Sequence, residues 1–463
     1  MSYNTDDMTH LIHHRSILAV VLTFLIFSST TEPFADDELP ILGEQAVLNI
    51  AQETRIGQKI YDQLVTRGLV ETDAMLNRYI NDLGIQLLST LDNRVREYRF
   101  FIVRDSNINA FALPGGYIGI NVGLILSSRN RHQLAAVLAH EIAHVRLRHG
   151  LRLMEKSNST SSKVLLTILA GLLIGSNSDL GAALVYGAAA SGQQSMVNYT
   201  RDFEYEADRL GIDILQSAGF DGQSMADFFQ MLGSASGHSE SQNIEYLRTH
   251  PVSDNRIAEI ESRLQQPQTK SFGPDYFPLF QDYLRYIADD GTLSDNSRFS
   301  QALSKIKAGQ AQAANDLLAA LYTSDRDNFW YGYVYAENLQ FLHKRVEAIT
   351  VYRQLLAIYP DDFIFLFKLM RLLKDDAQFN PALVIGRQLE NSHPDHKMVF
   401  FELVDLYRLT GQLLLETLAQ ADYHRLDGSV DVAIKLYDRA LNLPDIDAAT
   451  VFKVQERLAE LRG

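Results

Sequence analysis

Apolar residues recur at helical spacing along most of the chain. From about residue 44 to residue 95 they fall three or four positions apart, which predicts helices. The pattern becomes that of strands at Tyr98–Val103 and at Gly116–Asn121, with the turn formers Pro114–Gly116 between them. The pattern therefore predicts a mainly α domain that contains a small β-sheet.

Two later stretches predict a helix and a domain boundary. An apolar stripe predicts a helix from about Arg131 through Arg148, closed by Gly150 as its C-cap. Residues 265–274 are polar, contain two prolines and follow a helical pattern, so we place the boundary there.

Beyond this boundary the sequence repeats itself. Matching segments begin at Ala314, Ala348 and Ala382, thirty-four residues apart, and this is the period of the tetratricopeptide repeat. A later copy at Ala433 falls out of phase, which predicts an irregular helical insert near residues 395–430. We therefore expect an α-solenoid that binds polypeptide segments, with an ordinary helical bundle as the alternative.

The N-terminus has the order of a secretory signal. Arg15 precedes the apolar run Ile17–Phe27, and the small residue Ala35 comes before an acidic stretch. The run is shorter than the roughly 20 apolar residues of a membrane span. We expect a signal peptide over residues 1–35, with an uncleaved anchor as the alternative because Pro33 fits a cleavage site poorly.

Composition narrows the chemistry. Forty-two Lys plus Arg against fifty-seven Asp plus Glu give a net charge of -15, which disfavours nucleic-acid binding. The chain has no cysteine, so disulfides, thiolate catalysis and Cys-containing metal sites are excluded. Any metal must be held by His and carboxylate side chains.

The stretch His140-Glu141-Ile142-Ala143-His144 carries the strongest chemical signal. Residues four apart share one face of a helix, so His140 and His144 can bind one ion while Glu141 takes a proton from bound water. The alternative is a helix with two surface histidines.

Catalytic zinc needs a third protein ligand and an open position. A metzincin-type third ligand is excluded, since Leu147 and Gly150 stand where that pattern needs Gly and His. His149 is nine residues past His140, and on a continuous helix it would point to the opposite side, so we expect a solvent or packing residue.

A later acidic helix is the other source of a ligand. Glu204 and Asp208 are four apart, so one can bind the metal while the other accepts the free N–H of a ligating imidazole. Ala207 is small enough to let this helix approach the first one closely. Glu206 points elsewhere, and we expect it to be a solvated charge.

These motifs resemble a known family. His140–His144 and Glu204–Asp208, about sixty residues apart, are similar to the zinc metallopeptidases that include the CAAX prenyl endoproteases and the HtpX-type membrane proteases. Asn109–Gly116, Thr249–Pro251 and Arg256 resemble flanking segments of that family. The resemblance implies one Zn²⁺ per chain, held by His140, His144 and Glu204, with Glu141 as general base and Asp208 as partner of a ligand imidazole.

The same resemblance suggests roles for three further places. The strand at Asn109, Ala110 and Phe111 would pair with an extended substrate, although an ordinary hairpin is the alternative. Arg256 would stabilise the oxyanion or pair with Asp208 or Glu141, or form a surface salt bridge. We hypothesise that His250 occupies the fourth zinc position at rest, because a four-ligand site is closed.

Two apolar runs within residues 164–190 separate the two halves of the predicted site. Each run is too short to span a bilayer, so we weigh a buried core, a lid over the cleft and a peripheral membrane contact.

The predicted organisation is a signal peptide (1–35), a zincin-type metalloprotease domain (36–268), a linker with a first helix (269–296) and a tetratricopeptide repeat domain (297–463). The resemblance implies a periplasmic zinc endopeptidase with a chaperone-like role. Such an enzyme would promote assembly of outer-membrane β-barrel proteins, degrade stalled or misassembled ones and contact the barrel-assembly machinery. The alternatives are a non-proteolytic assembly scaffold with a structural or closed metal site, and a CAAX-type processing protease, which the secretory signal disfavours.

Overall fold

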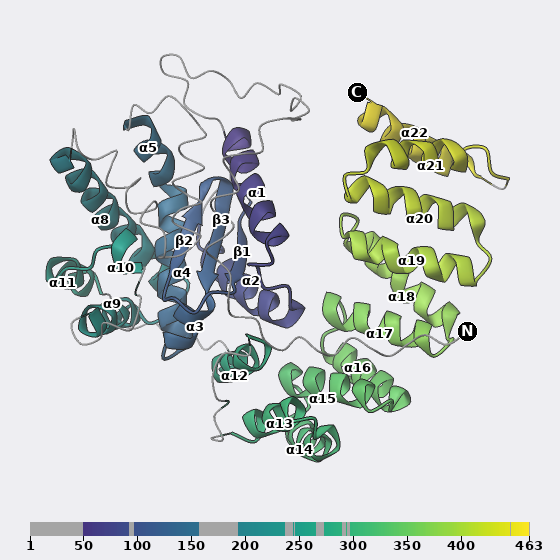
Figure 1. The fold of residues 1–463 in the computed structure, drawn as a ribbon, viewed down its shortest axis with the longest axis horizontal. Helices are drawn as coiled ribbons and strands as arrows, with labels where there is room; N and C mark the ends of the chain where they lie inside the picture. Colours follow the sequence, from purple (N-terminus) through teal and green to yellow (C-terminus); the bar gives the residue numbers. More distant parts are fainter. Residues whose placement is uncertain are drawn as a thin grey trace, which may run out of the picture. The chain divides into compact units, whose positions relative to one another are not determined.

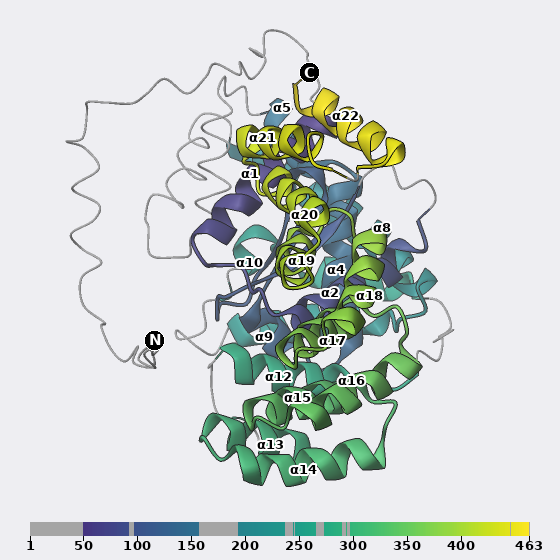
Figure 2. The same ribbon diagram turned by 90° about the vertical axis from the view of Figure 1, so that its right-hand side faces the viewer.

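The structure of the chain is a computed structural model, shown from two directions in Figures 1 and 2. It describes residues 50–91, 97–156, 193–236, 244, 246–264, 273–288, 293, 297–444 and 446–462. These residues form many helices and one three-stranded sheet, which confirms the predicted mainly α class with a helical solenoid. Within those ranges, no helix has both the length and the apolar character needed to cross a membrane.

Several sequence predictions fall outside this part of the chain. The signal peptide over residues 1–35, the apolar segment 164–190 and most of the boundary at 265–274 are not among the described residues. The predicted domain limits therefore stay predictions.

Two helices open the described part. Helix α1 spans Ile50–Thr66 and helix α2 spans Ala74–Leu88. Asp73 caps α2, because its side chain accepts a hydrogen bond from the Leu76 N–H at 3.0 Å. Most apolar residues of α2 are buried and form part of the core that supports the site, and the helix packs against β1.

The sheet contains strands β1 (Arg99–Val103), β2 (Ala110–Leu113) and β3 (Tyr117–Asn121) in the order β1-β3-β2. The central strand β3 runs parallel to β1 and antiparallel to β2, with Phe111 opposite Gly119. Strand β2 is therefore an edge strand within the described sheet, with one side open to a further strand.

The turn between β2 and β3 requires glycine. It is a short 3₁₀ helix, η2 (Pro114–Gly116), in which Gly115 has a φ of 79°. A Cβ atom on Gly115 would lie 2.4 Å from the Cα of Thr54 in α1. The absence of a side chain at Gly115 therefore allows α1 to pack directly against the turn that ends the edge strand.

Helices α3 (Val122–Ser127), α4 (Arg131–Arg146) and α5 (His149–Lys156) follow the sheet. Asn130 caps α4 by accepting a hydrogen bond from the Gln133 N–H at 2.9 Å. Helix α4 packs against β2 and β3 and is buried along most of its length (Figure 1). Burial on every side fixes the orientation of the side chains that α4 carries.

Helices α8 (Gln193–Ser217), α9 (Gln223–Ser236), α10 (Tyr246–Thr249) and α11 (Asp254–Ser262) complete this region. Helix α8 packs along α4, and the two backbones approach each other closely at Gly211. A Cβ atom there would lie 3.2 Å from the Cα of His140. Ala207, which the sequence suggested for this contact, is also fully buried.

The remaining residues form helical hairpins. Helix α12 (Phe277–Ala288) is followed by α13 (Arg298–Lys307), α14 (Ala311–Ser324), α15 (Phe329–Phe341), α16 (Arg345–Ile358), α17 (Phe363–Asp375), α18 (Phe379–Ser392), α19 (Lys397–Leu409), α20 (Leu413–Leu426), α21 (Val430–Ala440) and α22 (Ala448–Arg462). Figures 1 and 2 show these helices stacked one after another from α13 to α22.

The predicted irregular insert near residues 395–430 is wrong. Helices α14, α16, α18 and α20 begin at residues 311, 345, 379 and 413, so each start is thirty-four residues after the last. The period therefore continues through α19 and α20, although Leu413–Leu426 lacks the alanine pattern of the earlier copies. The copy at Ala433 lies on α21, the first helix of the next hairpin.

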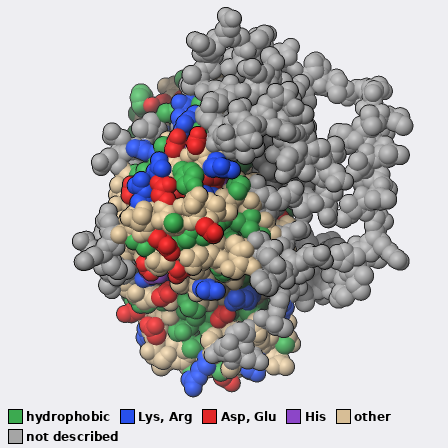
Figure 3. All heavy atoms as spheres, turned by 90° about the vertical axis from the view of Figure 1, so that its left-hand side faces the viewer, with side chains coloured by type: hydrophobic (Ala, Val, Ile, Leu, Met, Phe, Trp, Pro, Cys, Tyr) green, Lys and Arg blue, Asp and Glu red, His purple; other side chains and the backbone are tan. Residues whose placement is uncertain are grey.

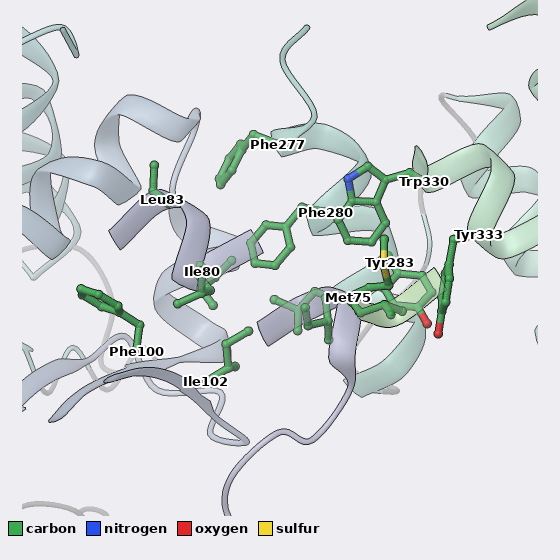
Figure 4. Close-up of a cluster of buried hydrophobic side chains, with 14 of the residues drawn as sticks. Met75, Ile80, Leu83, Phe100, Ile102, Phe277, Phe280, Tyr283, Trp330 and Tyr333 are labelled. Atoms are coloured by element: carbon green, nitrogen blue, oxygen red, sulfur yellow. The ribbon is translucent and has the colours of Figure 1, made fainter. Parts of the chain in front are cut away.

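A cluster of buried aromatic side chains joins α2, α12 and α15 (Figure 4). Tyr79 of α2 stacks on Phe280 of α12 with ring centroids 4.1 Å apart. The ring centroid of Tyr283 in α12 lies 5.4 Å from that of Trp330 in α15, and Trp330 is fully buried. The first repeat helices and the sheet-containing region therefore share one hydrophobic core.

The surface carries mixed charges where it can be followed in Figure 3. On that face Lys and Arg side chains lie among Asp, Glu and apolar side chains. The net charge of -15 is therefore not gathered into one acidic patch on this face.

Candidate metal centre

Helix α4 presents His140, Glu141 and His144 from one buried turn and the next. His140 and Glu141 are inaccessible to solvent, and His144 is partly buried. The Nε2 atoms of His140 and His144 lie 3.0 Å apart, because residues four apart on a helix stand one above the other. Both imidazole nitrogens are thus directed to the same point.

Helices α8 and α10 bring two more groups to that point. The carboxylate of Glu204 lies 3.4 Å from the Nε2 atom of His140 and 3.4 Å from that of His144. The Nδ1 atom of His250 lies 3.1 Å from both oxygens of Glu204 and 3.4 Å from the Nε2 atom of His140. One atom from each of these four residues lies within 4.8 Å of the other three.

This donor set fits a divalent cation. Imidazole nitrogens and one carboxylate oxygen are the ligands that catalytic zinc takes in proteins. Glu141 supports the fit, because both of its buried oxygens accept no hydrogen bond from any residue that the structure describes. One of these oxygens lies 3.6 Å from the Nε2 atom of His250. A buried carboxylate that accepts no hydrogen bond, beside a metal centre, is suited to bind a water molecule.

The protonation equilibria agree with a site for a cation. Burial lowers the pKa of His144 well below its usual value and so favours the neutral imidazole. Burial also lowers the pKa of His140, but the contacts with Asp208 and Glu204 outweigh it and raise the value to about 9. A metal ion placed between these groups would replace that proton.

The pKa values of the two glutamates at the centre, Glu204 of α8 and Glu141 of α4, shift in opposite directions. Burial opposes the charge on Glu204, yet His250, His140 and His144 hold its pKa well below the usual range. Burial raises the pKa of Glu141, which matches the need of a general base that works near neutral pH.

Asp208 and Arg256 contact the candidate ligands His140 and Glu204. Asp208 lies 3.1 Å from the Nδ1 atom of His140. Arg256 donates two hydrogen bonds to Asp208, at 2.7 and 2.8 Å, and one to the carbonyl of Pro251 at 2.6 Å. Its Nη1 atom is also 3.0 Å from Glu204. Burial opposes the charge on Arg256, but these acidic partners raise its pKa.

These contacts decide between the alternatives for Arg256. The side chain is 1% exposed, so a surface salt bridge is excluded. Its guanidinium pairs with Asp208 and Glu204 rather than with Glu141. Each of its three nitrogens donates to at least one of these acceptors, and a role as a donor to an oxyanion stays a prediction.

The structure corrects the predicted position of His149. The Nδ1 atom of His149 lies 2.9 Å from the Nδ1 atom of His144, and its ring is buried. Glu206 pairs with His149 and with Arg152, and its side chain is 37% exposed. The reason for the position of His149 is that α4 ends at Arg146, so the angular count along a continuous helix does not apply. Gly150 is consequently not the C-cap, which is Leu147.

Tyr246 helps to position His250 and was not predicted from the sequence. Its ring is fully buried and stacks on His250 with centroids 4.6 Å apart. Its N–H donates to the carbonyl of Ile108 at 3.0 Å, and its carbonyl accepts from the His250 N–H at 2.7 Å. The position of Tyr246 four residues before His250 is the signal that could have identified it.

The predicted substrate strand is the edge strand of the sheet. Ala110 and Phe111 belong to β2, and Asn109 precedes it with its carbonyl bonded to the Asn121 N–H at 2.9 Å. Helix α4 packs against β2. The predicted substrate strand therefore contacts the helix that carries His140.

Comparison with known proteins gives a consistent result. Residues 74–264 match the model of Peptidase family M48. The chain is 27% identical over 471 residues to the beta-barrel assembly-enhancing protease of Escherichia coli strain K12, which covers 97% of this chain and 96% of that protein. It is 34% identical over 316 residues to a relative from Vibrio cholerae, covering 64% of this chain and 65% of that protein. A match to the human mitochondrial metalloendopeptidase OMA1 is 30% identical over 173 residues and covers 36% of this chain and 32% of that protein.

Proposed function

We propose that this chain, a metalloendopeptidase whose residues 74–264 match Peptidase family M48, uses one zinc ion. The ion would be held by His140, His144 and Glu204. The observation that carries this proposal is the convergence of these three side chains from α4 and α8, with Glu141 buried beside them. Three protein ligands leave one position for water or substrate.

The chemistry divides between the ion and the side chains. When bound, zinc would polarise the scissile carbonyl and lower the pKa of a water molecule to about 7. Glu141 takes the proton from the attacking water and passes it to the leaving amine. The carboxylate of Asp208, 3.1 Å from the Nδ1 atom of His140, keeps the Nε2 atom of that ring directed toward the ion. Arg256 holds Asp208 and Glu204 in place.

The edge strand is the proposed docking site for the substrate. An extended peptide can pair with the open side of β2, along Asn109, Ala110 and Phe111, through backbone hydrogen bonds. Backbone pairing requires no particular side chain, so this mode suits an enzyme that acts on unfolded chains.

His250 is the proposed fourth ligand of a closed resting state. Support comes from its Nδ1 atom, which lies 3.4 Å from the Nε2 atom of His140. A site with four protein ligands cannot activate water. Replacing His250 by Ala is expected to raise proteolysis, measured on an unfolded protein substrate, and unchanged or lost activity would contradict this role.

The biological role is proposed from the relatives. The Escherichia coli relative is a beta-barrel assembly-enhancing protease, and it aligns with nearly the whole chain. We infer that this chain acts in the periplasm, where its tetratricopeptide repeats recruit outer-membrane β-barrel proteins and contact the barrel-assembly machinery. It would promote their assembly and degrade those that stall.

The Glu141→Gln variant tests the enzyme against the scaffold alternative. We expect it to retain zinc and to lose cleavage of a misassembled outer-membrane protein by at least about 100-fold, since general base catalysis contributes roughly 10²–10⁴-fold. Glu259→Gln is the matched control, because Glu259 pairs with Arg209 on the exposed side of α11. If Glu141→Gln keeps zinc and leaves the fate of the client unaltered, the scaffold alternative is correct.

A further inference from the structure

The junction between α4 and α5 places His149 against the metal centre. Helix α4 ends at Arg146, and Arg148 adopts a left-handed conformation with a φ of 56°. This conformation is unfavourable for a residue with a side chain and therefore marks a place where the fold imposes the geometry. It breaks the helical path, so that α5 begins at His149 and the imidazole of that residue lies beside His144.

Three contacts define the position of the His149 ring. Its Nδ1 atom is 2.9 Å from the Nδ1 atom of His144. Its Nε2 atom is 3.2 Å from an oxygen of Glu206, which also accepts a hydrogen bond from Arg152 at 2.6 Å. The ring stacks on Phe203 with centroids 4.2 Å apart and an interplanar angle of 10°. His149 is only 3% exposed, so these contacts replace its contacts with water.

The hydrogen positions in this chain of groups follow from one requirement. A metal ligand must present a lone pair, and the Nε2 atom of His144 is the one that faces His140 and Glu204. The proton of a neutral His144 ring is then on Nδ1, where it is donated to His149. His149 in turn carries its proton on Nε2 and donates it to Glu206. With these protons in place, each donor faces an acceptor, and both imidazole rings are neutral.

We propose that His149 is a positioning residue for the metal centre and that Glu206 fixes the tautomer in which His149 can accept from His144. The inference rests on the proposed zinc site. It gives His144 the kind of support that Asp208 gives His140, so that both ligand imidazoles are held by an acceptor on the side away from the ion. Arg152, whose Nη1 atom lies 2.6 Å from a carboxylate oxygen of Glu206, holds that carboxylate beside His149.

Two substitutions separate this role from simple packing. His149→Phe keeps a ring that can stack on Phe203 but removes the acceptor. His149→Asn removes the ring, while its side-chain oxygen can occupy the place of the Nδ1 atom and accept from His144. If His149 only packs against its neighbours, His149→Asn should weaken zinc binding more than His149→Phe does. If His149 accepts a hydrogen bond from His144, His149→Phe should weaken zinc binding more.

The test measures zinc affinity of the full chain by competition with a chromophoric chelator at one fixed pH, together with the melting temperature of the zinc-free protein. We expect His149→Phe to weaken zinc binding about 10–100-fold, which is the usual effect of losing such a partner, and His149→Asn to weaken it less. Glu206→Gln is expected to weaken zinc binding more than His149→Asn does and less than His149→Phe does.

Two outcomes would overturn the assignment. The assignment is refuted if His149→Phe binds zinc as tightly as the unaltered chain does. It is also refuted if the losses of zinc affinity in His149→Phe and His149→Asn are proportional to their losses of melting temperature. Failure of the zinc site itself is distinguishable, because the unaltered chain would then bind no zinc or would bind it equally well after His140→Ala. That result would refute both the proposed function and the role of His149.

Discussion

Replacing Gly211 by Ala tests how closely α8 must approach α4. The added Cβ atom would lie 3.2 Å from the Cα and 3.3 Å from the backbone nitrogen of His140. Ordinary contact distances are a few tenths of an ångström longer, and both atoms belong to a buried helix that packs on the sheet. The two helices must therefore separate slightly at the level of a metal ligand.

The magnitude follows from two opposing effects. Overpacking of a well-filled interior costs about 1–3 kcal/mol, while Ala in place of Gly inside a helix gains about 1 kcal/mol. The expected net change is a loss of roughly 0–2 kcal/mol in the free energy of unfolding. Because Glu204 is on α8 and His140 is on α4, the separation should also weaken zinc binding.

Gly233→Ala is the matched control. Gly233 also lies inside a helix, α9, but a Cβ atom there would meet no atom of the described residues within 4 Å. This substitution should therefore stabilise the protein by roughly 0.5–1 kcal/mol and leave zinc affinity unchanged. Melting of the zinc-free chain and chelator competition would measure both effects. Equal stabilisation by the two substitutions, with unchanged zinc affinity, would refute the argument from close approach.

Three further predictions concern buried charge, pH and the metal. Arg256→Met leaves Asp208 and Glu204 buried without their cation and should cost about 3–5 kcal/mol in urea unfolding; a cost under about 1 kcal/mol would contradict the pairing. Burial and the neighbouring Arg131 lower the pKa of His132, so the folded state binds fewer protons than the unfolded state and loses stability as the pH falls below 6.5. Melting temperatures between pH 7.5 and 5.5 should consequently fall more steeply for the unaltered chain than for His132→Gln, and equal slopes would refute this. Zinc at 1,000 times its dissociation constant should stabilise the chain by about 4 kcal/mol over the chelator-treated form, and unchanged melting would argue against a bound ion.

Local periodicity was sufficient to predict the parts of the site that lie on continuous helices. His140 and His144 share a face of α4, and Glu204 and Asp208 share a face of α8, because each pair is four residues apart. The strand spacing predicted β1 and β3, whereas the edge strand β2 was suggested only by the family resemblance of Asn109–Gly116. The structure brings the two helices together as the donor chemistry required.

What the sequence did not reveal depends on the path of the backbone between elements. The left-handed conformation of Arg148 has no signature in an arginine, so the end of α4 and the position of His149 could not be read from the residue types. The prediction instead placed the helix end at Gly150, the nearby glycine. Likewise, Gly211 was overlooked because a glycine inside a helical pattern reads first as a destabilising residue, and only the packed pair shows why it is small.

The repeat region shows a related limit. Helices α19 and α20 keep the thirty-four-residue period of their neighbours, yet the alanine at the start of the second helix is replaced by other residues. A small side chain is one way to bring two helices together, and different side chains can fill the same space. Regular geometry can therefore continue where the sequence pattern no longer does.

The aromatic cluster of Figure 4 has a practical consequence, since Trp330 is the only tryptophan of the chain. Its indole extends from α15, packs against Phe280 and Tyr283 of α12, and is completely shielded from solvent. Intrinsic fluorescence excited at the indole band thus reports on one place alone, the seam where the repeats begin. A shift of its emission to longer wavelength would reveal opening of that seam in real time, with no label attached and no substrate present.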